Sequence, residues 1–247
     1  MSAINTTAPE DRIPLSHKFA YGMGGFVNNL LASASGGMMI ILNLGFGMNP
    51  ALVGLLGALP RITDAFTDPI IGYISDTSKT KWGRRRPFMF WGAIASGVVF
   101  ALLWQVPEGS SETFIFVYFL IGSILFYLAA TVFATPWVAL GFELTPDYDE
   151  RTRLMGISNF FQQPVNLIAP GFLWFVSQET LFETQADGAA WLAIIVGVVV
   201  IGVGVFPALI LREPMQAVAM AELSQEDRSS LMDNLRSFFG GVQTTLK

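Results

Sequence analysis

The sequence predicts an all-α membrane protein with six transmembrane helices and one further amphipathic helix. Hydrophobic residues make up 52% of the 247 residues and charged residues only 13%, and the mean hydropathy is +0.52. Soluble domains carry about 25% charged residues. Six long apolar runs recur along the chain, and a membrane span needs roughly 20 such residues.

The six predicted spans follow one another with short breaks that carry turn or charge signals. Asn49-Pro50 ends the first span, and the basic run 79–86 separates the second from the third. Pro107, Pro146 and the acidic stretch 179–188 mark the later breaks. The predicted spans are 17–43, 51–73, 88–106, 113–141, 154–177 and 189–211.

The segments outside the spans complete the predicted domain organisation. Residues 1–16 are polar and form an N-terminal segment, and residues 17–212 form the six-span bundle. In the tail, 213–247, Ser224 and Asp227 resemble a capping box that opens an amphipathic helix. The apolar face of this helix needs a partner, either the bundle or the membrane interface.

Charge placement predicts the orientation of the spans. Basic residues lie before the first span, in two alternate loops and after the sixth span, and they include Lys79, Lys81 and Arg84–Arg86. The charged residues of the three opposite loops are all acidic, namely Glu108, Glu112, Glu179, Glu183 and Asp187. The positive-inside rule then places both termini in the cytoplasm of a multi-pass protein of the cell (inner) membrane.

Composition excludes several classes of function. With no Cys and a single His, His17, the chain cannot build a thiolate or multi-histidine metal site. It shows no phosphate-binding loop, no nucleophile elbow and no basic patch for nucleic acid. We therefore expect no enzyme and no nucleic-acid partner. We also expect no cofactor beyond a coupling ion.

Three charged residues interrupt the second predicted span. Arg61, Asp64 and Asp68 are three and four residues apart, so they share one face of a helix, with Thr67 beside it. Each ionised group at the bilayer centre costs about 2.5–3.5 kcal/mol. One reading is a self-neutralising Arg61–Asp64 pair. Since one Arg cannot neutralise two acids, the other reading is a site where the leftover carboxylate holds Na⁺ or a proton.

Neutral polar residues mark the faces of other spans. They comprise Asn28, Asn29, Ser33 and Ser35 in the first span, Tyr127, Thr131 and Thr135 in the fourth, and Asn159, Gln162, Gln163 and Asn166 in the fifth. Such amides and hydroxyls suit an uncharged polar solute because they donate and accept hydrogen bonds. Hydrogen bonding between packed spans is the alternative interpretation. Together these faces favour a water-accessible cavity.

Three stretches resemble a known family. Asp64-Ala-Phe-Thr-Asp68-Pro-Ile-Ile-Gly72-Tyr-Ile-Ser-Asp76, followed by Lys-Trp-Gly-Arg84-Arg85-Arg86-Pro, is similar to the major facilitator superfamily signature between the second and third spans. Thr135-Pro-Trp137 through Arg153 and Tyr21-Gly-Met-Gly-Gly-Phe26 are further matches. The sequence resembles the glycoside–pentoside–hexuronide:cation symporters, the group of melibiose permease.

The resemblance implies a role for each matching position. The coupling-cation site of the family falls on Asp64, Asp68 and Thr131, and Thr67 keeps an oxygen where the family has Asn. The sugar-binding positions differ: they fall on Asn29, Ala134, Asn159 and Val138, beside Trp137. With Gln163, the residues Asn29, Asn159 and Trp137 are the candidates for a different glycoside or a smaller polar solute. Gly72, Asp76 and Arg84–Arg86 match a charge latch that gates transport. A positive-inside anchor without a gating role is the alternative interpretation, and both can hold at once.

The resemblance also implies a fold that this chain fills in part. Family members consist of two six-span halves, each built from three-span inverted repeats. The expected function is cation-coupled transport of a small polar solute by alternating access, in the lipid bilayer and with a second half. That half is the same chain continued, a homodimer or a sister subunit. An accessory subunit of a larger membrane complex, without transport, is the alternative.

Overall fold

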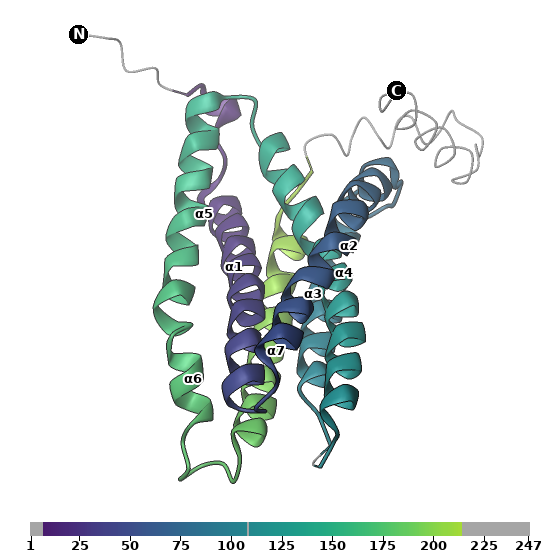
Figure 1. Cartoon of the computed structure of the whole chain (residues 1–247). Helices are drawn as coiled ribbons and strands as arrows, with labels where there is room; N and C mark the ends of the chain where they lie inside the picture. Colours follow the sequence, from purple (N-terminus) through teal and green to yellow (C-terminus); the bar gives the residue numbers. More distant parts are fainter. Residues whose placement is uncertain (1–6, 108, 214–247) are drawn as a thin grey trace. The chain divides into compact units, whose positions relative to one another are not determined.

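The computed structural model describes residues 7–107 and 109–213, and every regular element in those residues is helical. A short 3-10 turn, η1 (Pro9–Asp11), precedes α1 (Leu15–Leu44), α2 (Pro50–Thr77), α3 (Arg86–Leu103), α4 (Glu112–Glu143), α5 (Tyr148–Ile168), α6 (Gly171–Val176) and α7 (Gln185–Ile210). These elements belong to one unit, residues 1–214 (Figure 1). The predicted tail, 213–247, lies outside the described residues apart from Glu213, and the amphipathic helix predicted within it lies outside them entirely.

Four of the described helices are long and apolar enough to cross a membrane: α1, α3, α4 and α7. They correspond to the predicted first, third, fourth and sixth spans. The second predicted span is α2, whose apolar character is reduced by Arg61, Asp64 and Asp68. The fifth predicted span begins within α5, whose sequence is polar, and is interrupted after Ile168.

The break in the fifth predicted span corrects its continuity. The structure ends α5 at Ile168 and starts α6 at Gly171, so residues 154–177 do not form one helix. Pro170 contributes to the interruption, because proline has no N–H to donate to the carbonyl of Asn166.

Side-chain caps explain where several helices begin. The Asn49 side chain accepts the N–H of Ala51 at α2, and Ser111 accepts the N–H of Phe114 at α4. Asp147 caps α5 through the N–H of Glu150, and Thr184 forms a capping box with Asp187 at α7. Each cap satisfies backbone donors that a helix start leaves free.

The helices pack in pairs that place the polar faces. The principal pairs are α3 with α7, α3 with α4, α1 with α5, α2 with α4, and α1 with α7. Glycine makes the closest approach possible: a Cβ added at Gly97 or Gly197 would collide with the carbonyl of the other. Helices α1, α2 and α4 surround a common space. Helices α3 and α7 pack against each other and connect α4 to α1.

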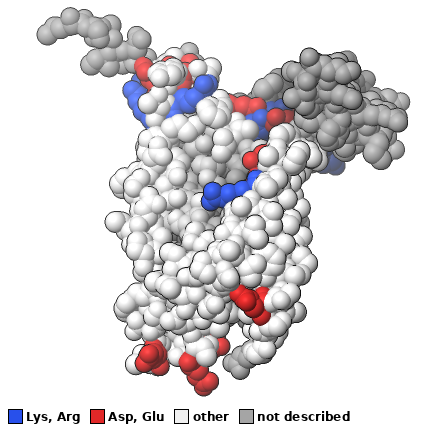
Figure 2. Space-filling model, in the orientation of Figure 1, with Lys and Arg blue, Asp and Glu red and all other residues white. Residues whose placement is uncertain are grey.

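Charge separates the two ends of the bundle. On the face in Figure 2, basic side chains gather at the upper end and reach toward the middle, while the charged side chains of the lower end are acidic. We call the upper end, with Lys18, Arg84–Arg86, Arg151 and Arg153, the basic end. We call the lower end, with Glu112, Glu179, Glu183 and Asp187, the acidic end.

Candidate functional site

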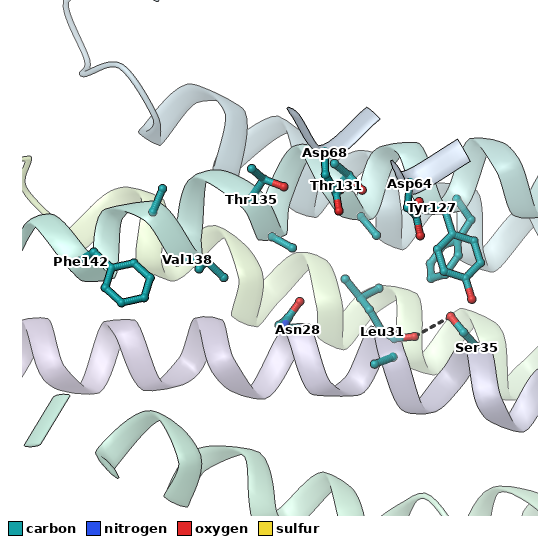
Figure 3. A pocket seen from close by; sticks show the side chains of 15 residues that line it. Asn28, Leu31, Ser35, Asp64, Asp68, Tyr127, Thr131, Thr135, Val138 and Phe142 are labelled. Atoms are coloured by element: carbon teal, nitrogen blue, oxygen red, sulfur yellow. Dashed lines mark hydrogen bonds between the residues drawn. The ribbon is translucent and has the colours of Figure 1, made fainter. Parts of the chain in front are cut away.

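A cavity of about 600 Å³ lies between α1, α2 and α4. Figure 3 shows Asp64 and Asp68 on one wall, with Tyr127, Thr131 and Thr135 close by and Asn28 and Ser35 across from them. The rest of the wall is apolar and is formed by Leu31, Ala32, Phe126, Ala130, Ala134, Val138, Ala139 and Phe142. The cavity thus combines two carboxylates with neutral hydrogen-bonding groups and no basic side chain.

The two carboxylates have different surroundings. The Thr131 hydroxyl donates to Asp68 Oδ1 at 2.9 Å, which joins α4 to α2. Asp64 Oδ1 is buried and has no hydrogen-bond partner, and the Thr67 hydroxyl oxygen is buried and unpartnered in the same way. A buried polar atom without a partner is costly, so these oxygens are fit to receive a ligand that supplies positive charge or a proton.

Arg61 does not neutralise this pair. Its side chain is exposed, and no ion pair joins it to Asp64 or Asp68 in the part of the chain that the structure describes. The self-neutralising Arg61–Asp64 pair that the sequence left open is therefore not formed. Both carboxylates line the cavity without a basic side chain among its lining residues.

The four predicted solute residues lie outside the cavity wall. The Asn29 amide donates to the carbonyl of Gln162 at 2.9 Å and to Asn166 Oδ1 at 3.0 Å, so it ties α1 to α5. Asn159 and Gln163 are exposed on α5. In their place the wall presents Asn28, which the sequence marked as polar without favouring it.

Trp137 has a packing role between α1 and α4. Its indole N–H donates to the Tyr21 carbonyl at 3.1 Å, and its ring stacks on that of Tyr21 with centroids 4.8 Å apart. The side chain is buried, and its neighbour Val138 lines the cavity instead.

Of the predicted latch residues, Asp76, Arg84 and Arg85 meet at the basic end, while the Arg86 side chain bonds carbonyls of α7. Arg85 donates to Asp76 Oδ1 from Nε at 2.8 Å and pairs with Glu143 at 3.0 Å. Arg84 pairs with Glu143 at 3.1 Å. Gly72 stands opposite Thr135, where α2 approaches α4. The loop before α3 thereby connects α2 to the end of α4.

Glu143 and Glu213 are functional candidates that the sequence did not single out. Glu143 was part of a matched stretch, but nothing in its local pattern shows that two arginines about 60 positions earlier reach it. Glu213 accepts backbone N–H groups of the loop that carries Arg84–Arg86.

A second charged cluster holds the start of α5. The Glu150 side chain is 1% exposed, pairs with Lys18 at 2.5 Å and Arg153 at 3.1 Å, and accepts the N–H of Ile13 at 3.0 Å. Burial alone raises the pKa of Glu150, but these hydrogen bonds and the nearby Lys18 charge outweigh it and lower the pKa. Glu150 is therefore an ionised anchor for the segment before α1.

The fold and site define a multi-pass membrane protein with a cavity of about 600 Å³ that two carboxylates line. A family model described as MFS/sugar transport protein matches residues 20–244. The chain belongs to this family, the group of glycoside–pentoside–hexuronide cation symporters. Its members are transporters and not enzymes.

Individual relatives are similar over about three fifths of the chain. The isoprimeverose transporter of Lactiplantibacillus pentosus is 32% identical over 155 residues, 61% of this chain and 32% of the relative. The inner membrane symporter YicJ of Escherichia coli is 30% identical over 143 residues, 58% and 31%. The mouse sodium-dependent lysophosphatidylcholine symporter 1 is 28% identical over 147 residues, 58% and 28%. The matches span about a third of each relative's length.

Proposed function

We propose that this chain forms one six-span half of a cation-coupled secondary transporter for a small polar solute, in particular a sugar or glycoside. The half works by alternating access together with a second six-span half. The family supports transport, the name of the isoprimeverose transporter supports a sugar, and a sodium-dependent relative supports a coupling cation.

The observation that carries the proposal is the cluster of oxygens on one wall of the cavity. Asp64 Oδ1 and the Thr67 hydroxyl lack partners, and Asp68 has only the Thr131 hydroxyl. Asp64 and Asp68, aided by Thr67 and Thr131, bind Na⁺ or a proton. Hard cations prefer such carboxylate and hydroxyl oxygens.

Charge neutralisation links this site to transport. With the cation absent, closing the two halves places two carboxylates in a dry interior, which is costly. A bound cation removes much of that cost, so the occluded form becomes accessible. A ligand shifts states only by its differential affinity, so cation and solute must both prefer the occluded form.

Neutral groups provide the solute surface in this proposal. Asn28, Tyr127 and Thr135 lie in the wall beside the carboxylates. Asn159 and Gln163 are exposed on α5, where they remain candidates that face a second half. Asn29 and Trp137 are candidates at one remove, because their hydrogen bonds hold the α5 and α4 faces against α1.

The arrangement in the membrane forms part of the proposal. All six predicted spans cross the bilayer, as two three-span inverted repeats, with α5 and α6 sharing the fifth span. Both termini and the basic end are cytoplasmic. There Gly72, Asp76 and Arg84–Arg86 act as the gating latch. The second half covers the exposed polar faces of α2 and α5.

Cation binding tests the proposal without knowledge of the solute. Na⁺ is titrated calorimetrically into the purified complete transporter at several pH values. Asp64→Asn and Asp68→Asn should each abolish Na⁺ binding and any competition between Na⁺ and protons. Both variants should also abolish concentrative uptake of isoprimeverose, the solute in the name of one relative, in proteoliposomes. Glu112→Gln, at the acidic end, is the matched control. If both carboxamide variants bind Na⁺ and transport like the parent, the assignment of Asp64 and Asp68 as the coupling site is wrong. The alternative of an accessory subunit without transport would then be favoured.

A further inference from the structure

At the basic end, a charged side chain from the end of α7 bonds the backbone at the start of α3, and a charged side chain from the start of α3 bonds the backbone at the end of α7. Glu213, two residues after the α7 C-cap, accepts the backbone N–H groups of Arg84 at 2.9 Å, Arg85 at 2.9 Å and Arg86 at 3.2 Å. These groups lead into α3, which begins at Arg86. The Glu213 carboxylate thus closes the N-terminal end of α3.

Arg86 makes the reverse connection. Its Nε donates to the carbonyl of Ala208 at 2.7 Å, and its Nη2 donates to the carbonyl of Leu209 at 2.9 Å. Both carbonyls belong to the last turn of α7. A residue of each helix end therefore satisfies the free backbone groups of the other.

Helix electrostatics favours both halves of this exchange. A helix start leaves N–H groups without partners and a helix end leaves carbonyls without partners. The start carries partial positive charge and the end partial negative charge. A carboxylate at the start of α3 and a guanidinium at the end of α7 match these signs.

The surroundings make Glu213 a buried, enclosed acceptor. Its side chain is 1% exposed, and Arg84 Nε lies 3.9 Å from its second oxygen. Gly83 has φ +118°, and a Cβ there would overlap the Glu213 carboxylate. Only glycine combines that backbone conformation with room for the carboxylate.

We propose that Glu213 and Arg86 form a reciprocal helix cap, in which Glu213 is a positioning residue for the arginines of the latch. Glu213 fixes the backbone of Arg84 and Arg85, whose side chains then reach Asp76 and Glu143. The exit of α7 and the latch consequently move as one body. The consequence for gating rests on the proposed transport function, but the cap itself does not.

Hydrogen–deuterium exchange of the complete protein in nanodiscs, without added cation or solute, tests the cap. Glu213→Gln keeps the size of the side chain and removes its charge. A hydrogen bond to a charged group contributes enough that we expect exchange at the amides of residues 84–86 to rise about tenfold. Glu112→Gln is the control. The Glu112 carboxylate, at the acidic end, accepts a single N–H, from Asn49 at 2.8 Å, so its replacement should leave exchange at residues 84–86 unchanged.

A charge swap separates a reciprocal cap from an ordinary ion pair. In the double variant Glu213→Arg with Arg86→Glu, a simple pair would be restored. A cap would become worse than in either single variant, because each charge then opposes its helix end. Parent-like exchange in the double variant, or in Glu213→Gln alone, would overturn the proposal.

Cysteine labelling provides the readout for the latch. The chain has no Cys, so a single cysteine at Ser78, the C-cap of α2, reports on the loop that follows Asp76. Glu213→Gln should speed its labelling from the basic end, and unchanged labelling would refute the positioning role. Failure of cation binding would leave both outcomes intact, so the two proposals can fail separately.

Discussion

The buried carboxylates at the basic end differ from those in the cavity in how completely their oxygens are bonded. Glu150 and Glu213 each receive at least three N–H donors and have side chains that are 1% exposed. Asp68 receives one hydroxyl, and Asp64 Oδ1 receives nothing. The protein is therefore able to saturate a carboxylate and does not do so in the cavity.

This difference separates structural acids from the acids that we propose to bind a cation or proton. A saturated carboxylate contributes stability and has no capacity left for a ligand. An unsaturated one costs stability until a ligand arrives. Substitutions at the two kinds of site should therefore differ in their effects on the empty protein and on the cation-bound protein.

Removing Glu150 should have the largest effect on the empty protein. Glu150→Ala leaves Lys18 and the Ile13 N–H without their acceptor, and breaking a buried pair in this way costs about 3–5 kcal/mol. Thermal unfolding in detergent measures the loss. Glu150→Gln should recover part of it, and a parent-like melting temperature for Glu150→Ala would show that the cluster is not an anchor.

Acid should act on the same anchor. Because the folded pKa of Glu150 lies below its ordinary value of 4.5, the stabilisation is fully present above that value and is lost as the pH falls through the folded pKa. Melting temperatures between pH 6 and pH 3 in the parent and in Glu150→Gln should converge at the acid end. Parallel curves would contradict the assignment.

Replacing Asp64 should leave the empty protein as stable as the parent or more so, while removing the response to cation. A ligand at one hundred times its Kd stabilises a protein by about 2.7 kcal/mol. The melting temperature of the parent should therefore rise with Na⁺ or with protonation, and that of Asp64→Asn should not. A parent-like rise in Asp64→Asn would remove the contrast between the two groups of acids.

The Thr131–Asp68 bond should account for a smaller step. Thr131→Val removes the hydroxyl at constant shape and should weaken cation binding roughly tenfold, with a stability change of about 1 kcal/mol. Thr131→Ser keeps the donor and should bind like the parent. Equal binding by both variants would mean that the hydroxyl has no part in the site.

The smallest effect should come from Glu112. Its carboxylate is exposed and accepts one N–H, so Glu112→Gln should change the free energy of unfolding by less than about 0.5 kcal/mol. Thermal unfolding beside Glu150→Ala checks this. A loss comparable to that of Glu150→Ala would show that the number of donors does not set the ranking.

The sequence allowed the helices and the position of the carboxylates to be predicted, because both follow from local patterns. Apolar runs are long enough to mark helices, and the spacing of Asp64 and Asp68 alone puts them on one face. The interruption at Pro170 was signalled by the residue itself, although the predicted fifth span ran through it.

Contacts between distant parts of the chain could not be predicted in this way. Glu213 meets Arg84 across 129 positions and Glu150 meets Ile13 across 137, and no local pattern encodes such distances. Asn28 and Asn29 show the other limit. They are adjacent, yet the turn of about 100° per helical residue sends Asn28 to the cavity and Asn29 to α5.

The two prolines inside α2 have a mechanical consequence. Pro60 and Pro69 lie on either side of the stretch that carries Asp64 and Asp68. Each proline lacks the N–H that would bond the carbonyl four residues earlier, so one backbone hydrogen bond of the helix is missing at each place. A helix bends at the lowest free-energy cost where backbone hydrogen bonds are missing. The eight residues between the prolines, which include both acids, can therefore tilt relative to the flanking turns of α2.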